Sequence, residues 1–250
     1  MRKMKMLACL VGVLGAAAIA SADFIAFNDM NLLAAPYAPH VNATTISYIQ
    51  SGQLKNIVSG AVLPVTATGT IVGDTNDQYG NGGDCNAGTD AGVFRNIVAV
   101  PGSSELEPVG QSPRASSYTM TFSNLNPAMQ YIVTLTGNRA DSGYTKRWSR
   151  VSIAGADSFT NSSSSGVTVI SPSEVAFCTG HNTVTGYVAQ WPDIAPGSDG
   201  IFSVTSTRHD AYTEKGYAMT VFRLEEVVPE PATVGLLCLG GLALLRRRRG

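Results

Sequence analysis

The feature that most constrains the fold is a succession of short runs, rich in β-branched and aromatic residues, between residues 23 and 226. Turn residues separate these runs at spacings of about 8 to 15 residues, and helical periodicity is almost absent. Many short strands without intervening helices predict an all-β fold, an antiparallel β-sandwich, and within that class we favour a jelly roll. The predicted strands are 24–27, 44–49, 61–72, 91–100, 118–122, 131–136, 147–153, 167–170, 183–191, 200–207 and 216–224.

Three local features refine this prediction. The clearest turn is Asn124–Pro127, between two of the predicted strands. Pro64 lies inside a predicted strand and therefore indicates an edge or a bulge. The one helical candidate is the short segment Met30–Ala35.

Residues 1–22 have the composition of a secretory signal peptide. Basic residues precede the apolar run 6–18, and small residues follow it, as signal peptidase requires. Ala20 and Ala22 are the small residues that define the site, so we expect cleavage before Asp23. Signal peptidase is therefore an expected processing enzyme.

The end of the chain, residues 227–250, contains a proline-rich tetrapeptide, the apolar run 232–245 and a cluster of arginines. As a helix rising ~1.5 Å per residue, the apolar run is ~21 Å long, shorter than the ~30 Å hydrocarbon core. It can span if the bilayer thins and the arginines snorkel, so we expect a short transmembrane helix. The tetrapeptide is Val228, Pro229, Glu230 and Pro231, and the charges are Arg246, Arg247, Arg248 and Arg249.

This order of segments resembles the PEP-CTERM sorting signal of bacterial envelope and matrix proteins, which an exosortase recognises. The terminal charges resist translocation and place the C-terminus in the cytoplasm. The prolines favour an extended backbone that a membrane-embedded protease can bind. The resemblance implies cleavage near Pro229–Pro231 and delivery of the mature protein to the cell surface. The alternative is an ordinary membrane anchor, which Gly235, Gly240 and Gly241 would weaken.

Charge excludes one class of partner. Residues 23–230 contain 10 of the 17 basic residues and all 18 acidic ones, a net charge of −8. Such a surface has no cationic field to attract phosphate, so we expect no nucleic-acid partner.

Two of the four cysteines remain in the exported body, Cys85 and Cys178, because Cys9 and Cys238 lie in the terminal segments. In an oxidising compartment they could form one disulfide, which we expect to add about 2–4 kcal/mol of stability. The alternative is two buried free thiols. Their spacing does not suit a thiolate metal site.

The second half of the body, about residues 91–226, resembles a β-sandwich module common in exported PEP-CTERM proteins. Galactose-binding-like and carbohydrate-binding sandwiches share its Asn-Pro and Asp-Gly turns. The resemblance implies a fold and no defined reaction. The residues that carry it are Leu125–Pro127, Tyr131, Arg139, Tyr144, Arg147-Trp148, Gly186–Val188, Trp191–Gly200 and Gly216-Tyr217.

An aromatic and arginine set indicates a possible glycan platform, because sugar rings stack on aromatic faces and arginine bonds hydroxyl groups. Tyr144 is the best exposed candidate, while Trp148 and Trp191 are expected in the core. Arg139 and Arg147 complete the proposed contacts with an exopolysaccharide. The other aromatic members of the set are Tyr187 and Tyr217.

Residues 74–90 combine acidic and amide side chains with many glycines. Oxygen ligands on such a loop suit Ca²⁺, although the spacing is not that of an EF-hand, and a flexible polar loop is the alternative. The candidate ligands are Asp74, Asp84, Asn86 and Asp90. No other cofactor is expected.

The sequence contains no catalytic motif, so we expect a protein that is not an enzyme. His40, His181 and His209 are expected to be exposed loop residues, and the pairs Glu105/Glu107 and Asp193/Asp199 to be solvated charges. Three functions follow. The first is a non-catalytic envelope or matrix protein, the second a carbohydrate-binding module, and the third an extracellular hydrolase that would need a convergent cleft.

Overall fold

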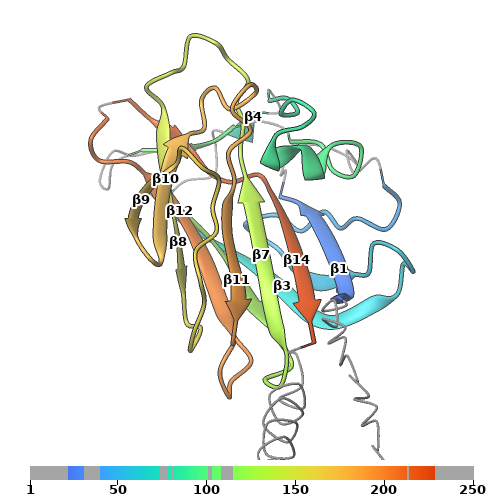
Figure 1. Ribbon diagram of the computed structural model, residues 1–250. Coiled ribbons are helices and arrows are strands. Elements are labelled where there is room, and N and C mark those ends of the chain that lie inside the picture. Colours follow the sequence, from blue (N-terminus) through green and yellow to red (C-terminus); the bar gives the residue numbers. More distant parts are fainter. Residues whose placement is uncertain are drawn as a thin grey trace, which may run out of the picture. The chain divides into compact units, whose positions relative to one another are not determined.

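The computed structural model describes residues 22–30, 40–73, 78–79, 82–100, 103–107, 115–212 and 214–228 (Figure 1). These residues form fourteen strands and one short 3-10 helix, η1 (Asp90–Phe94). The strands are β1 (Ala22–Asp29), β2 (Ser51–Lys55), β3 (Val62–Val72), β4 (Gln78–Tyr79), β5 (Ser103–Leu106), β6 (Ser117–Ser123), β7 (Gln130–Thr136), β8 (Trp148–Ala154), β9 (Thr168–Ser171), β10 (Glu174–Cys178), β11 (Ala189–Ile194), β12 (Phe202–Arg208), β13 (Gly216–Tyr217) and β14 (Val221–Val227).

Every paired strand is antiparallel, and the strands form two main sheets. The first sheet has the order β1-β14-β7-β11, and the second has the order β2-β3-β6-β12-β8-β10-β9. A small third sheet contains β13-β5-β4. Figure 1 shows the first sheet in front of strands of the second. The all-β prediction is confirmed, and the two sheets are consistent with a β-sandwich.

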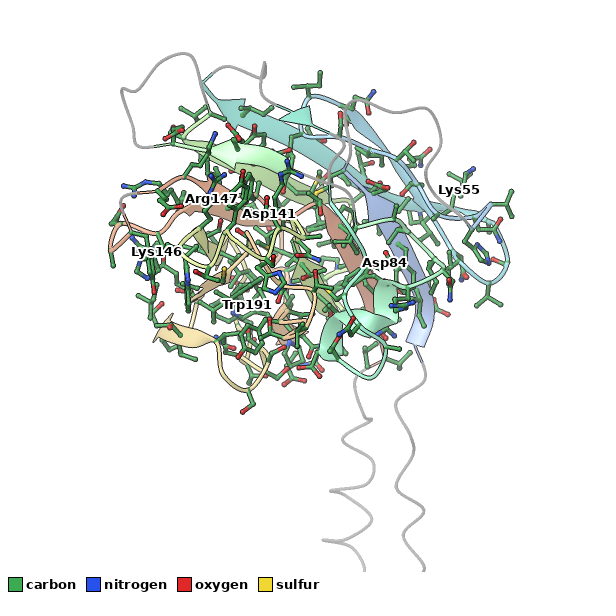
Figure 2. All side chains as sticks on the ribbon, turned by 90° about the horizontal axis from the view of Figure 1, so that it is seen from above. Lys55, Asp84, Asp141, Lys146, Arg147 and Trp191 are labelled. Atoms are coloured by element: carbon green, nitrogen blue, oxygen red, sulfur yellow. The ribbon has the colours of Figure 1, made fainter. Side chains whose placement is uncertain are left out.

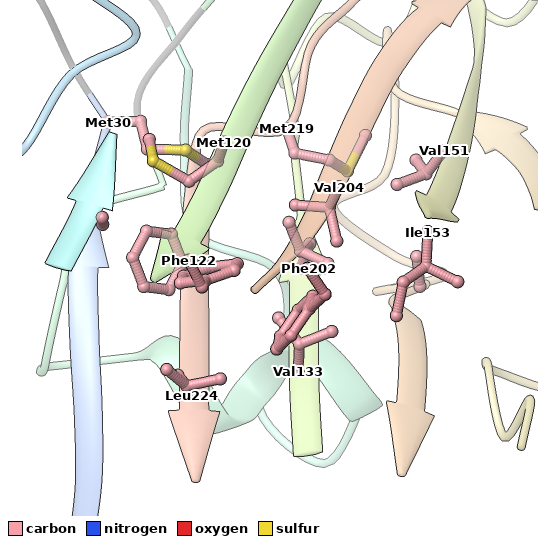
Figure 3. Close-up of a cluster of buried hydrophobic side chains, with 14 of the residues drawn as sticks. Met30, Met120, Phe122, Val133, Val151, Ile153, Phe202, Val204, Met219 and Leu224 are labelled. Atoms are coloured by element: carbon pink, nitrogen blue, oxygen red, sulfur yellow. The ribbon is translucent and has the colours of Figure 1, made fainter. Parts of the chain in front are cut away.

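The main core lies between the two sheets. In β6 every second residue is buried, so Tyr118, Met120 and Phe122 all face the first sheet. Figure 3 shows Met120 and Phe122 in this core. The ring centroid of Phe122 lies 5.0 Å from that of Phe202 in β12 and 4.9 Å from that of Phe222 in β14. The Phe122 and Phe222 rings meet edge to face. Since both hydrophobic clusters of the described residues lie within 24–224, this body contains its own core.

A second cluster covers the outer face of the first sheet. Phe27 of β1 packs edge to face on Phe94 of η1, with ring centroids 5.9 Å apart. Ala91 and Val98 are buried beside Phe94, a spacing of three and four residues that suits a helical turn. The prediction of a strand over 91–100 was therefore wrong, because this segment is a turn that caps the sheet.

The segment 44–49 also differs from the prediction of a strand. Thr44 forms only an isolated bridge with Asn28. The Asn28 side chain then substitutes for a strand partner, since it donates to the carbonyl of Ile46 and accepts from its amide, both at 2.8 Å. Side-chain hydrogen bonds can replace a ladder in this way.

Seven predicted strands coincide with observed strands to within two residues, and these are 24–27, 61–72, 118–122, 131–136, 147–153, 167–170 and 200–207. The predicted strand 183–191 contains only the start of β11, and 216–224 is divided between β13 and β14. Pro64 lies at the register shift between β2 and β3, where residues 63–65 of β3 oppose Leu54 alone, as predicted for a bulge. β2, β4, β5 and β10 were not predicted.

The two turns that carried the sandwich resemblance touch each other. The amide of Leu125, in the Asn-Pro turn, donates to the carbonyl of Gly200 at 3.1 Å. Gly200 has a φ of 65°, and a Cβ there would lie 2.5 Å from the carbonyl oxygen of Leu125. Glycine is therefore required at this position.

Some predictions concern residues outside the described ones. They are the signal segment up to Ser21, most of the helical candidate 30–35, and the transmembrane helix within 232–245. Among the residues that the structure does describe, no helix is sufficiently long and apolar to cross a membrane.

Candidate functional site

The first and last strands of the body are neighbours in the first sheet. Ala22 pairs with Val227, and Phe24 pairs with Glu226, with a register shift between Ala22 and Phe24. The predicted signal-cleavage site before Asp23 and the start of the predicted sorting tail therefore lie at the same end of one strand pair. Val228 follows β14 directly and is 42% exposed. Ala20, Pro229, Glu230, Pro231 and Arg246–Arg249 are outside the described residues.

A second candidate region is a rim formed by the segments 137–148, 208–212 and 214–217, which we call the aromatic rim. At its centre, Arg147 is a cation–π partner of two tyrosines: its guanidinium carbon lies 3.3 Å from the ring centroid of Tyr144 and 5.6 Å from that of Tyr217. The two rings are nearly parallel, at 22°, with centroids 6.3 Å apart. Arg147 also donates to the Tyr217 hydroxyl and, at 3.4 Å, to Oε2 of Glu214.

Electrostatics keep this arginine charged. Burial lowers the pKa of Arg147, but Tyr217, Tyr144 and Glu214 together raise it above its ordinary value. Burial also raises the pKa of Tyr217, against the opposing effect of Arg147, so the hydroxyl remains protonated. The centre of the rim is therefore a cation held against aromatic faces.

The outer part of the aromatic rim is a second aromatic stack. The Trp148 and Tyr212 rings are parallel within 12°, at 5.1 Å, and His209 meets both edge to face. Trp148 Nε1 donates to the carbonyl of Thr145 at 3.0 Å. Burial, followed by the charge of Arg150, lowers the pKa of His209, so its imidazole is neutral at pH 7.

Backbone contacts fix the rim. The amides of Thr179 and Gly180 both donate to the carbonyl of Arg147 at 3.0 Å. A Cβ at Gly180 would lie 2.3 Å from the Tyr144 carbonyl oxygen and 2.9 Å from the Arg147 Cβ. The loop that carries Tyr144 and Arg147 therefore depends on the absence of a side chain at residue 180. Figure 2 shows Asp141, Lys146 and Arg147 on one side of the body and Lys55 on the other.

The aromatic and arginine set predicted from the sequence is only partly brought together. Tyr144, Arg147 and Tyr217 form the centre of the rim, and half-buried Arg139 acts electrostatically on Tyr217. Tyr144 is half-buried rather than exposed.

The remaining aromatic residues have different positions. Trp191 is fully buried in the core, as expected, and Trp148 is only half-buried, in no described core cluster. Tyr187 packs edge to face on Phe177 of β10. Sequence reasoning missed Tyr212, for which the available signal was an aromatic residue in the loop that follows β12, two residues after Asp210.

Comparison with protein families gives one match. Residues 227–249 match the family model described as the PEP-CTERM protein-sorting motif. The chain carries a PEP-CTERM sorting motif. Searches of curated proteins and of solved structures found no match.

The PEP-CTERM motif indicates an exported, envelope-associated protein that is sorted at its C-terminus. The motif begins at Val227, the last residue of β14, so its first residue is part of the folded sheet. The preceding residue, Glu226, accepts a 2.5 Å hydrogen bond from the hydroxyl of Tyr131.

The predicted disulfide of this PEP-CTERM protein is not formed, and both thiols are free. Cys85 is buried in the cluster on the outer face of the first sheet, where burial raises its pKa to about 12. Cys178 ends β10, and its Sγ lies 3.3 Å from the carbonyl oxygen of Tyr144. The structure thus has two free thiols, as in the alternative, but Cys178 is half-buried and not buried.

The calcium prediction receives no support from the described part of the chain. Asp84, Asn86 and Asp90 are exposed, and Asp74 lies outside the described residues. No group of three His, Cys, Asp or Glu residues that could hold a metal occurs among the residues described.

The titratable residues considered for catalysis occupy structural positions. All three histidines are half-buried, so the prediction that they are exposed was wrong. Glu105 is buried and bonded at 2.6 Å by Lys215. Asp193 accepts a 2.8 Å hydrogen bond from Thr160.

Proposed function

We propose that this is a non-catalytic structural or interaction protein of the cell envelope or extracellular matrix, exported by the general pathway and processed at its sorting motif. Signal peptidase removes residues 1–22, and an exosortase cuts near Pro229–Pro231. The apolar run 232–245 tethers the precursor to the membrane until that cut. The sandwich body, of jelly-roll type, is the part that is delivered.

The observation that carries this proposal is the PEP-CTERM match at residues 227–249. The position of the motif supports processing of a folded body, because β14 ends at Val227 and only Val228 separates it from Pro229. The acidic composition of residues 23–230 suits a soluble exported body.

Mass spectrometry of the protein from its native cell surface tests the proposal. We expect a mature form that lacks both terminal segments. Replacing Pro229 and Pro231 with alanine together should leave the tail attached, whereas the control Pro127→Ala, at an exposed turn residue of the body, should be processed normally. Untrimmed wild-type protein recovered from the cytosol would refute the proposal.

Carbohydrate binding at the aromatic rim is the second candidate function. It is supported by Arg147 beside Tyr144 and by the Trp148–Tyr212 stack on neighbouring loops. Arginine can bond sugar hydroxyl groups while an aromatic face stacks on a ring, so an exopolysaccharide is the proposed ligand.

Binding of the exported body to an array of bacterial exopolysaccharides tests this second candidate. Tyr144→Ala and Tyr212→Ala should each lower the signal at least about tenfold, equivalent to the loss of about 1.4 kcal/mol. Lys55→Ala, on the other side of the body, is the control and should bind normally. Equal binding by all three variants, or the absence of any signal, would exclude the rim as a glycan site.

A further inference from the structure

The β1–β14 pair brings two acidic residues, Asp23 and Glu226, close to each other at the end of the sheet. Asp23 is the extra residue at the register shift between Ala22 and Phe24. In such a bulge two residues of one strand oppose a single residue of the other. The exposed side chain of Asp23 is accordingly close enough to Glu226 to raise the pKa of that carboxyl group.

Glu226 lies in a restricted environment. Glu226 is only 7% exposed, and its Oε2 accepts the hydrogen bond from the hydroxyl of Tyr131. The Phe24 and Tyr131 rings, 6.4 Å apart, line this end of the core. Burial raises the pKa of Glu226, the Tyr131 hydrogen bond opposes that rise, and Asp23 adds to it.

Among the residues that the structure describes, no cation acts on the pKa of Glu226. Neighbouring Glu225 and Arg223 bond to each other at 2.8 Å, and by strand alternation they point to the opposite face of the sheet. From β7 the titratable side chain that faces Glu226 is Tyr131, and from β1 it is Asp23. Two carboxyl groups in one site disfavour ionisation of both, unless a cation joins them.

We propose that Asp23 and Glu226 form a binding site for the primary ammonium group that signal cleavage creates at the N-terminus of the mature chain. The inference rests on the proposed cleavage before Asp23. Before that cut the nitrogen of Asp23 is a neutral amide. After it, the same atom is an α-ammonium adjacent to both carboxylates, and it locks β1 onto the strand that leads into the PEP-CTERM motif.

A comparison of four proteins tests the site, using residues 23–228, which contain both described clusters of the core. One protein begins at Asp23, released from a leader that a site-specific protease removes completely. Its partner retains the natural residues 20–22, so its amine lies three residues away. Each is also made with Glu226→Gln. Pairing between Ala22 and Val227 is present in both extended proteins and therefore cancels in the comparison.

At pH 6.5 the protein that begins at Asp23 should gain about 2–4 °C in Tm over its extended partner, after subtraction of the difference measured in the Glu226→Gln pair. The gain should disappear above about pH 9, where the amine is neutral. Equal differences in the two pairs would overturn the inference.

A direct measurement covers the case in which Glu226→Gln does not fold. The pKa of the ¹⁵N-labelled α-amine in the unmodified protein should exceed the ordinary range of about 7.7–8.0, and a value within or below that range would overturn the site. Mapping the native N-terminus tests the proposed cleavage position separately from the proposed ammonium site. A start at another residue would refute cleavage before Asp23, whereas the four-protein comparison still reports on the ammonium site.

Discussion

The Tyr131 hydroxyl donates a 2.5 Å hydrogen bond to Glu226 Oε2, and it accepts a 2.7 Å hydrogen bond from the amide of Asn126. One side chain thus joins the Asn-Pro turn, the core strand β7 and the residue that precedes the PEP-CTERM motif. Burial is the main cause that raises the pKa of Tyr131, so this hydroxyl stays a donor at all physiological pH values.

Tyr131→Phe should therefore destabilise the body by about 1–3 kcal/mol, because it removes the partner of a buried carboxyl group. Urea unfolding followed by fluorescence measures the change. Tyr144→Phe is the control, since no described residue hydrogen-bonds its hydroxyl, and it should change stability by less than about 0.5 kcal/mol. Equal effects of the two substitutions would contradict this role of Tyr131.

The stability of the body should fall as the pH rises through the weakly acidic range. Burial is the largest cause that raises the pKa of both Glu225 and Glu226 in the folded protein. The folded state therefore binds these protons more tightly than the unfolded state. The resulting stability is fully present below the unfolded pKa of about 4.3 and is lost as the pH rises through the folded pKa.

Urea titrations from pH 4 to pH 7 measure this effect on the protein that begins at residue 20, in which no ammonium group lies beside Glu226. The double variant Glu225→Gln and Glu226→Gln should lose less stability over this interval than the wild type does. Glu214→Gln, at a side chain that is 44% exposed, should leave the wild-type profile unchanged. A double variant with the wild-type pH dependence would show that other groups cause it.

Gly180→Ala should distort the aromatic rim, because the new Cβ would lie 2.3 Å from a backbone oxygen of Tyr144. We expect a loss of about 1–3 kcal/mol in stability. Gly143→Ala in the same loop is the matched control, since its Cβ would lie 3.3 Å from a carboxylate oxygen of Asp141, which can move. Fluorescence of Trp148 should change in the first variant and not in the second.

Gly69→Ala should be among the most destabilising single substitutions. Its Cβ would lie 2.3 Å from the Cα of Tyr48, in the segment that crosses β3. The neighbouring atoms belong to the backbone of Ser47 and Tyr48, which cannot move aside as a side chain can. We therefore expect the free energy of unfolding to fall by about 3 kcal/mol or more. Gly52→Ala, whose Cβ would meet only the flexible side chain of Ile46 at 3.2 Å, should cost much less. Thermal unfolding measures both.

The two thiols should react separately. Alkylation of the unreduced, unfolded mature protein should add two groups, as detected by intact mass. In the folded protein Cys178 should react faster than Cys85, because Cys85 is fully buried and burial raises its pKa to about 12. A mature protein that gains no mass without a reductant would show a disulfide and contradict the structure.

Local sequence patterns were sufficient to predict a strand whose alternate residues face the core, as Tyr118, Met120 and Phe122 do. They wrongly predicted a strand over 44–49, where a side chain holds the backbone instead of a β-ladder. There the Asn28 side chain forms hydrogen bonds with the backbone of Ile46. The turn at 91–98 could have been read from the spacing of Ala91, Phe94 and Val98, which favours a helical turn over alternation.

The sorting address of this protein follows from the sequence by itself, because proline restriction, apolar length and terminal charge are properties of consecutive residues. The same is true of strand alternation, which depends only on the period of the backbone. Only the tertiary structure decides which distant residues meet. It places Arg147 against Tyr217, 70 residues further along, and it pairs Ala22 with Val227. The physical reason is that strand order and register depend on packing of the entire core, and no single segment contains that information.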